Sequence, residues 1–395
     1  MHKRSVLIFG CGALQRSIIC KARALGLLTV GIDPCAEAVA RDAVDVFEVV
    51  GGRDFERTMA VARRYAVSAL VTAATDKPLE MMARAASALS LPFFSVETAR
   101  WSTDKWQMKQ RFLSGGVPCA RGCLISCAEE ARNLDFPIII KPRDNSGSRG
   151  VRLCWNMDDV EQAFAYARGF SHLEQILAEE VIEGKEYSME GLHFDGRSEV
   201  LQFTEKQTTP FPYNVELGHR QPARLCAEKK HALREMLERI GQCMGFEHCA
   251  SHTEFKINEK GIFIIESSPR TGGDYIVSDL TPLSTGVDME TQLLKIAFGE
   301  KPELSARPAE RAAGVSFFCF PEGRLSEVPS AFEALAGSEG MVHWDFRLKA
   351  GDRVPFLTNS LDRYGEYILS AETRDALDER MDAIEQEIFQ ETKRA

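Results

Sequence analysis

The stretch that decides the fold runs from residue 252 to residue 274 and reads HTEFKINEKGIFIIESSPRTGGD. Apolar and polar residues alternate on both sides of Asn-Glu-Lys-Gly, which predicts an antiparallel β-hairpin with a positive φ at Gly261. A three-residue loop at 259–261 would place Glu254 directly opposite Glu266. Opposed carboxylates repel each other unless a cation lies between them, and all-oxygen ligation suits Mg²⁺. The hairpin therefore predicts either a magnesium site or a solvated strand edge.

The second strand of this hairpin runs directly into charged and flexible residues. Glu266 follows an apolar run, and Arg270 and two glycines come soon after it. Because a strand buried on both faces avoids charge, these side chains lie at the surface or face a ligand.

The composition is that of an ordinary globular protein. The chain has 395 residues, of which 44% are hydrophobic and 27% charged, and its net charge is −10. This length predicts two or three lobes. Without a long basic run, nucleic acid is not an expected partner, and no apolar segment approaches the roughly 20 residues of a membrane span. Eleven cysteines without C-x-x-C pairs indicate free thiols. We therefore expect a cytoplasmic protein.

The first hundred residues alternate apolar strands with amphipathic helices, which predicts a parallel sheet with right-handed crossovers. The expected strands are 5–9, 29–33, 46–50 and 69–73, and the expected helices are 14–25, 55–65 and 79–89. Within this region FGCGALQ resembles the start of a dinucleotide fingerprint, with Asp33 where a ribose acid would lie. Gln15 replaces the third glycine, so we favour a tight strand-to-helix turn over a nicotinamide site.

A domain boundary is expected near Ser102, followed by an N-capped helix that ends at Gly115. The segment 136–156 then reads as two strands joined by the glycine- and serine-rich loop 144–150. Such a loop can place backbone N–H groups over phosphate oxygens, with Lys141 nearby as a point charge, although a plain hairpin turn fits the same residues. The chain contains no Walker P-loop.

These features together indicate phosphoryl transfer. The chain offers Lys105 and Lys141 for phosphate, a flexible loop, a carboxylate pair for metal, and Arg270 four residues beyond the second carboxylate. Phosphoryl transfer depends mainly on positioning and on neutralisation of charge, which this set of groups supplies.

At these residues the sequence resembles the ATP-grasp superfamily of carboxylate–amine ligases, over nearly the whole chain. The resemblance implies a mixed α/β and α+β fold. A Rossmann-like N-terminal parallel-sheet domain would occupy residues 1–102. A two-lobed ATP-grasp domain would follow, with its small lobe at 103–178 and its large lobe at 179–311, and a small α+β extension would form 312–395.

The resemblance also implies a role for individual residues. The residues matched to ATP binding are Lys105 and Lys141 for the phosphates, Ser146, Gly147 and Ser148 in the flexible loop, Glu179, Glu180 and Ile182 in the hinge that reads adenine, and Glu186 for the ribose hydroxyls. Glu254 and Glu266 match the magnesium ligands. Arg270 matches the catalytic arginine that stabilises the acyl phosphate and the tetrahedral intermediate, with Lys141 as the second catalytic group.

One position departs from the family pattern. The family reads E-x-N-P-R, with the asparagine as a third metal ligand, where this chain has Ser268. A serine hydroxyl or an added water would have to supply that oxygen. The elements HTE, R-x-G-G-D and VELGHRQPA most resemble the L-amino-acid ligase branch, which includes carnosine-synthase-like enzymes. In that branch the residues matched by Glu216, His219 and Gly273 line the amino-acid pocket together with Arg270.

We therefore expect an ATP-dependent ligase that forms an amide through an acyl phosphate, with ATP and Mg²⁺ or Mn²⁺ as cofactors. Its substrates would be small molecules, namely a carboxylic acid, expected to be an amino acid, and an amine. A homodimer is compatible with the sequence. One alternative is an enzyme that phosphorylates bicarbonate, like carbamoyl phosphate synthase, or a purine-biosynthesis ligase. Another alternative is an ATP-binding module without turnover.

Overall fold

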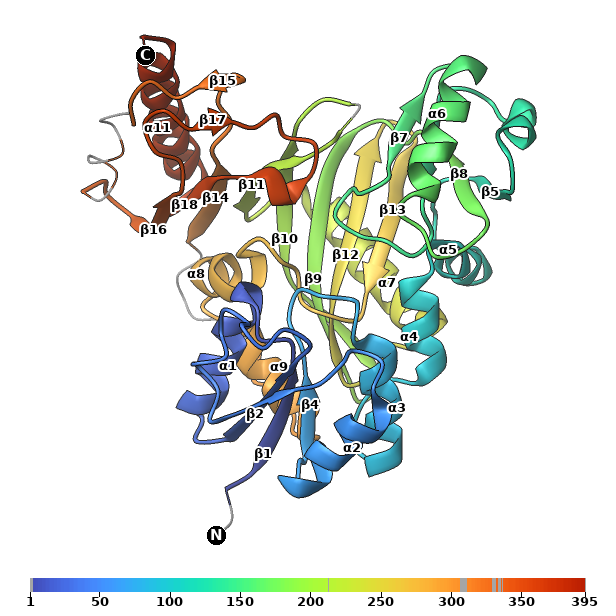
Figure 1. Cartoon of the computed structure of the whole chain (residues 1–395), viewed down its shortest axis with the longest axis vertical. Helices are drawn as coiled ribbons and strands as arrows, with labels where there is room; N and C mark the ends of the chain where they lie inside the picture. Colours follow the sequence, from blue (N-terminus) through green and yellow to red (C-terminus); the bar gives the residue numbers. More distant parts are fainter. Residues whose placement is uncertain are drawn as a thin grey trace.

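The computed structural model describes residues 3–211, 213–305, 311–328, 332, 335 and 337–394. Figure 1 shows an N-terminal sheet, a small sheet and a large central sheet that continues into the C-terminal region. Among the described residues, none of the helices has both the length and the hydropathy needed to cross a bilayer.

The N-terminal domain is built on a parallel sheet with the strand order β3-β2-β1-β4. The strands are β1 (Ser5–Phe9), β2 (Leu28–Asp33), β3 (Val46–Val49) and β4 (Ala69–Val71), and the helices are α1 (Arg16–Ala24), α2 (Phe55–Arg64) and α3 (Leu79–Leu89). Alternate residues of β1 enter two different cores: Leu7 packs in the cluster that contains Met59 and Met82, and Ile8 packs in the cluster that contains Ile18. The predicted parallel sheet is confirmed.

The turn after β1 is closed by its own side chains. The Cys11 backbone N–H donates to Asp33 Oδ2 at 2.8 Å, and the Gln15 side chain donates to the Ala73 carbonyl at 2.6 Å. Gln15 also accepts a hydrogen bond from the Gly12 backbone at 3.0 Å. These contacts hold the turn within its own lobe, and Gly12, Gln15 and Asp33 also line a cavity. The preference for a packing turn over a nicotinamide site stays a prediction.

The small sheet has the antiparallel order β5-β8-β6-β7 and is covered by a helix. Its elements are β5 (Gly122–Ile125), β6 (Ile138–Lys141), β7 (Arg152–Cys154), β8 (Ile176–Glu180) and α6 (Met157–Arg168). Two helices, α4 (Val96–Thr103) and α5 (Lys105–Ser114), connect it to the N-terminal domain. Asp104 caps α5 by accepting hydrogen bonds from the backbone N–H groups of Trp106 and Gln107, so the predicted helix begins at Lys105.

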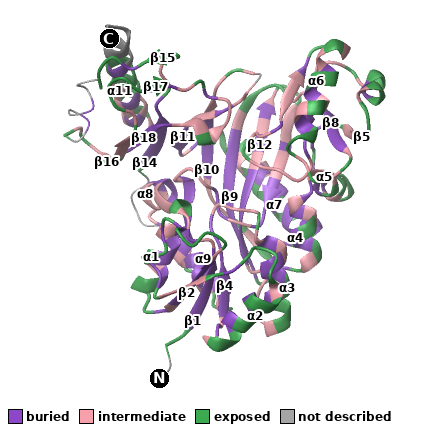
Figure 2. Ribbon diagram, viewed as in Figure 1, coloured by how far each residue is buried: buried purple, intermediate pink, exposed green. Residues whose placement is uncertain are grey.

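The large sheet has eight antiparallel strands in the order β13-β12-β9-β10-β11-β14-β18-β16. Its strands are β9 (Lys185–Phe194), β10 (Arg197–Thr208), β11 (Glu216–Gln221), β12 (Cys249–Asn258), β13 (Gly261–Ser268), β14 (Ala312–Phe317), β16 (Met341–Phe346) and β18 (Gly365–Ala371). The helices that accompany it are α7 (Ala227–Met244), α8 (Thr281–Thr285), α9 (Met289–Ala297) and α11 (Arg374–Arg394). A separate pair, β15 (Gly323–Arg324) and β17 (Arg353–Val354), lies in the C-terminal region. Figure 2 shows that burial is concentrated in the inner strands of these sheets.

The hairpin of β12 and β13 differs from the prediction in its loop. Asn258 pairs directly with Gly261, so the loop holds two residues and not the three predicted at 259–261. A bulge just after Glu254 shifts the register by one residue, and Glu254 still pairs with Glu266. Gly261 has the predicted positive φ, at +137°. The opposition of the two carboxylates is therefore confirmed, although the bulge and not the loop length produces it.

Candidate active site

A cavity of about 860 Å³ lies where the N-terminal domain, the small sheet and the large sheet meet. Its walls include every residue to which the sequence assigned a role, with one exception. These lining residues are Lys105, Lys141, Ser146, Gly147, Ser148, Glu179, Glu180, Ile182, Glu186, Glu216, His219, Glu254, Glu266, Arg270 and Gly273. The exception is Ser268, which is buried behind the wall. The structure thus gathers groups from segments far apart in the chain.

The two predicted phosphate lysines each contact a carboxylate. Lys105 Nζ lies 2.6 Å from Glu266 Oε2, and the Lys141 ammonium contacts Glu179, which Lys109 also approaches at 3.0 Å. Burial lowers the pKa of Lys141, and the neighbouring charges of Lys105 and Lys109 lower it further against the opposing effect of Glu179. The Glu179 side chain is therefore a counter-ion, a role that the sequence did not predict.

The loop between β6 and β7 borders the same cavity. Its side chains bond within or beside the loop: Asn145 donates to the Phe170 carbonyl at 2.9 Å, and Arg149 donates to the Ser146 carbonyl at 3.0 Å. Gly147 has a φ of +67°, and a Cβ added there would meet no atom within 4 Å. The predicted connection of two strands by a small-residue loop is confirmed, and the loop has an open side.

Lys206 on β10 lies between three glutamates and was missed in the sequence. Its ammonium is 2.6 Å from Glu216 Oε1, 2.9 Å from Glu254 Oε1 and 3.1 Å from Glu186 Oε1. Burial alone would lower the pKa of Lys206, but the three carboxylates raise it well above its usual value. In turn Lys206 and His252 hold the pKa of Glu254 well below its usual value, against the effect of burial. Glu254 is therefore an anion.

Arg270 is held by an aspartate of the N-terminal domain. Asp76, in the segment between β4 and α3, accepts hydrogen bonds from Arg270 Nε at 2.9 Å and Nη2 at 3.2 Å. The Ser268 hydroxyl donates to the same carboxylate. Burial opposes the charge of Arg270, but Asp76 raises the pKa of the guanidinium above its usual value. Asp76 was not predicted from the sequence, and it connects the N-terminal domain to the arginine.

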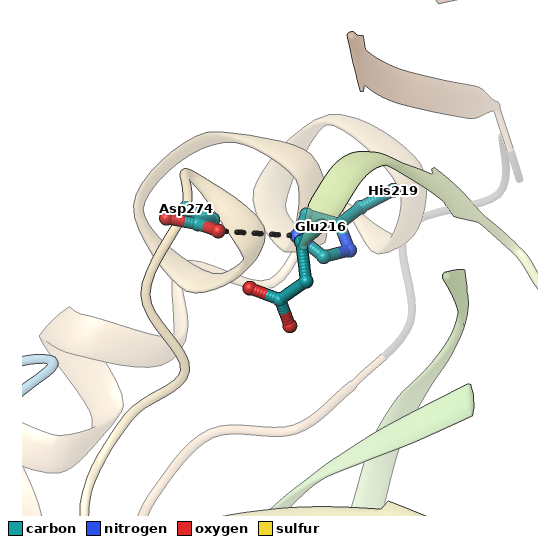
Figure 3. Close-up of side chains that lie close together, drawn as sticks. All are labelled: Glu216, His219 and Asp274. Carbon is teal, nitrogen blue, oxygen red and sulfur yellow. Dashed lines mark hydrogen bonds and ion pairs between the residues drawn. The ribbon is translucent and has the colours of Figure 1, made fainter. Parts of the chain in front are cut away.

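The predicted amino-acid pocket holds a cluster of three side chains. Figure 3 shows Glu216, His219 and Asp274 together, with His219 Nε2 at 3.5 Å from Asp274 Oδ2. Arg363 from the C-terminal region binds both oxygens of Asp274 at 2.7 Å. Glu216, His219 and Asp274 each offer one atom that could bind a metal ion. Glu216 also contacts Lys206, and Asp274 also contacts Arg363.

Comparisons with known proteins agree with this architecture. Residues 134–279 match the model of the ATP-grasp domain, and residues 316–393 match the model of L-amino acid ligase C-terminal domain 2. An L-amino acid ligase structure from Bacillus licheniformis superposes with a TM-score of 0.83 and 20% identity, over 98% of both chains. Residues 134–279 of this chain are thus identified as an ATP-grasp domain.

Its C-terminal domain is of the type found in L-amino acid ligases, and the curated relatives include members of that branch. Alanine–anticapsin ligase of Bacillus amyloliquefaciens is 27% identical over 63% of this chain and 58% of that protein. L-arginine-specific L-amino acid ligase of Bacillus subtilis is 26% identical over 61% of each. The chain thus spans about three-fifths of the length of these relatives.

Proposed function

We propose that this protein is an ATP-dependent carboxylate–amine ligase that forms an amide bond, with an amino acid as the expected acid substrate. The observation that carries the proposal is the convergence of Lys105, Lys141, the opposed Glu254 and Glu266, and Arg270 on one cavity. Binding ATP phosphates requires cations, and activating a carboxylate requires a donor where its oxygen becomes negative. The resemblance to L-amino acid ligases supports the same reaction.

The donor set fits a magnesium ion. Glu254 and Glu266 face each other across the hairpin and offer carboxylate oxygens, which Mg²⁺ prefers over nitrogen or sulfur. When bound, the ion would neutralise phosphate oxygens of ATP. The role of Ser268 as a third ligand stays a prediction, because its hydroxyl donates to Asp76 and it does not border the cavity.

In the proposed reaction, the substrate carboxylate oxygen attacks the γ-phosphorus of ATP and ADP leaves, which gives an acyl phosphate. The amine nitrogen then attacks the acyl carbon, and inorganic phosphate leaves as the amine gives up a proton. Lys105 and Lys141 hold the phosphates, and the loop 144–150 covers them. Arg270 has five N–H donors, of which three bond to Asp76 and Thr271. Its remaining donors are available to the developing oxyanion.

The remaining assignments distribute the substrates along the cavity. We propose that the strand-end segment Glu179–Ile182 binds adenine through its backbone and that Glu186 binds the ribose. Glu216, His219 and Gly273 would line the amino-acid pocket. The proposed units are those expected from the sequence, 1–102, 103–178, 179–311 and 312–395.

The test is a screen for ADP release with amino acids and small carboxylic acids, offered singly and in pairs, with mass spectrometry of the product. A ligase requires two partners and yields a product lighter than their sum by one water. ADP release with bicarbonate alone would replace the proposal by the bicarbonate-phosphorylating alternative. Tight ATP binding with no ADP from any pair would indicate a binding module without turnover.

A further inference from the structure

Lys206 differs from Lys105 in the number of carboxylates that its ammonium contacts and in the burial of its side chain. An ammonium has three N–H donors, and Lys206 Nζ has three carboxylate oxygens at 2.6, 2.9 and 3.1 Å. Its side chain is 1% exposed, whereas that of Lys105 is 18% exposed and contacts one carboxylate, Glu266. Lys206 is thus saturated by protein groups and is not placed to bind a phosphate itself.

The three carboxylates come from three different strands of the large sheet. Glu186 is on β9, Glu216 on β11 and Glu254 on β12, with Lys206 on β10 between them. Under the proposed function these carboxylates belong to three subsites, for the ribose, the amino acid and the metal. One buried cation therefore contacts all three subsites without contacting any ligand.

We propose that Lys206 is a positioning residue that holds the ribose, amino-acid and metal carboxylates in one array, so that filling one subsite favours filling the others. The inference rests on the proposed function for the identity of the subsites.

The physical basis is a shared charge. Without the ammonium, the carboxylates of Glu186, Glu216 and Glu254 would repel one another, so Lys206 holds all three side chains in place. A ligand that orders one carboxylate also orders the shared ammonium and, through it, the other two, which reduces the ordering cost of the next ligand. Lys256, 3.5 Å from Glu186, and His252, 3.3 Å from Glu254, support single members of the array, but neither contacts all three.

The experiment compares Lys206→Met, Lys206→Arg and the control Lys185→Met, which removes an exposed lysine of β9. We expect Lys206→Met to weaken binding of both AMP-PNP and Mg²⁺, each on the order of 10- to 100-fold as for other residues that act through a ligand. The KM of any amino acid that supports ADP release would rise as well. Lys206→Arg keeps the charge and would recover part of each loss, and Lys185→Met would match the parent protein.

Several results would overturn the inference. One is a folded Lys206→Met that binds AMP-PNP and Mg²⁺ like the parent, and another is a loss confined to the nucleotide, which would indicate direct phosphate binding. If Lys206→Met does not fold, Glu216→Gln gives the same test: it removes one support at the amino-acid end, and unchanged AMP-PNP affinity would contradict the coupling. Because AMP-PNP binding needs no ligase chemistry, absence of ADP release in the parent protein would contradict the proposed function, and the AMP-PNP and Mg²⁺ affinities of the variants would still test the coupling through Lys206.

Discussion

Replacing Arg270 by alanine is expected to abolish product formation and to leave ATP binding largely intact. Arg270 bonds to Asp76 and Thr271 through three of its five N–H donors, so under the proposed function two donors remain for the developing oxyanion. Removing one oxyanion donor costs about 100- to 1000-fold in rate, or about 2.7 to 4 kcal/mol of barrier. Arg270→Lys keeps the positive charge but lacks the planar guanidinium, so its rate should lie between those of the parent protein and Arg270→Ala.

The substitution also affects stability, and the two effects can be separated. Without the guanidinium, Asp76 loses the two hydrogen bonds that it accepts from Arg270, which we expect to cost about 1 to 3 kcal/mol. The double variant Arg270→Ala with Asp76→Asn removes the unpaired charge. It should regain stability toward urea but not activity, because the oxyanion donor is still missing.

The assay pairs ADP release with calorimetric titration of ATP or AMP-PNP. Activity of Arg270→Ala within about threefold of the parent would refute the assigned role, since the expected loss is far larger. Recovery of activity in the double variant would equally contradict it, because it would show that a misplaced Asp76 and not the absent donor caused the loss.

Glu266→Gln removes a carboxylate charge beside Lys105, and we expect the Mg²⁺ concentration for half-maximal ADP release to rise about 10- to 100-fold; an unchanged Mg²⁺ dependence would argue against a metal ligand. Gly184 has a φ of +126°, and a Cβ there would lie 2.3 Å from the Ile257 carbonyl oxygen, so Gly184→Ala should lower the free energy of unfolding by well over 1 kcal/mol. Gly196 has a φ of +69° with open space around it, so Gly196→Ala should lower that free energy by only about 1 kcal/mol. Equal urea midpoints for the two variants would refute this interpretation. Burial lowers the pKa of His193 to about 3, so between about pH 6.5 and 3 the unfolded chain binds a proton that the folded chain excludes, and stability falls as the pH falls. His193→Gln should show a shallower loss of stability over that window, and parallel pH profiles for the two proteins would contradict the burial effect.

The elements of the fold were predictable because they follow local patterns. The strands and helices of the N-terminal domain obey simple periodicity, and the prediction of α3 over 79–89 matches its observed bounds. The hairpin shows the limit of such patterns. A bulge after Glu254 has no sequence signal comparable to that of a glycine turn, so the opposition of Glu254 and Glu266 was predicted from a loop of the wrong length.

The side chains that hold the candidate site together were less predictable, because their partners are distant in sequence. Lys206 is flanked by Glu205 and Gln207 in a strand, and these polar neighbours give no indication that the lysine is buried. Asp76 and Arg363 likewise meet Arg270 and Asp274 only through the tertiary fold. A signal did exist for Asp76, since it follows β4 at the edge where the carboxyl ends of parallel strands place ligand-binding groups.

The continuity of the large sheet limits how this chain can be divided. In the C-terminal region β14 pairs with β11, and β18 pairs with β14, so the sheet passes through the expected boundary at residue 312 without a break. A truncated protein ending before Ala312 would leave the outer edge of β11 without its neighbour, and a bare strand edge recruits other chains. Attempts to isolate the nucleotide-binding half should therefore yield self-associating material, so the C-terminal region must accompany it in any recombinant product.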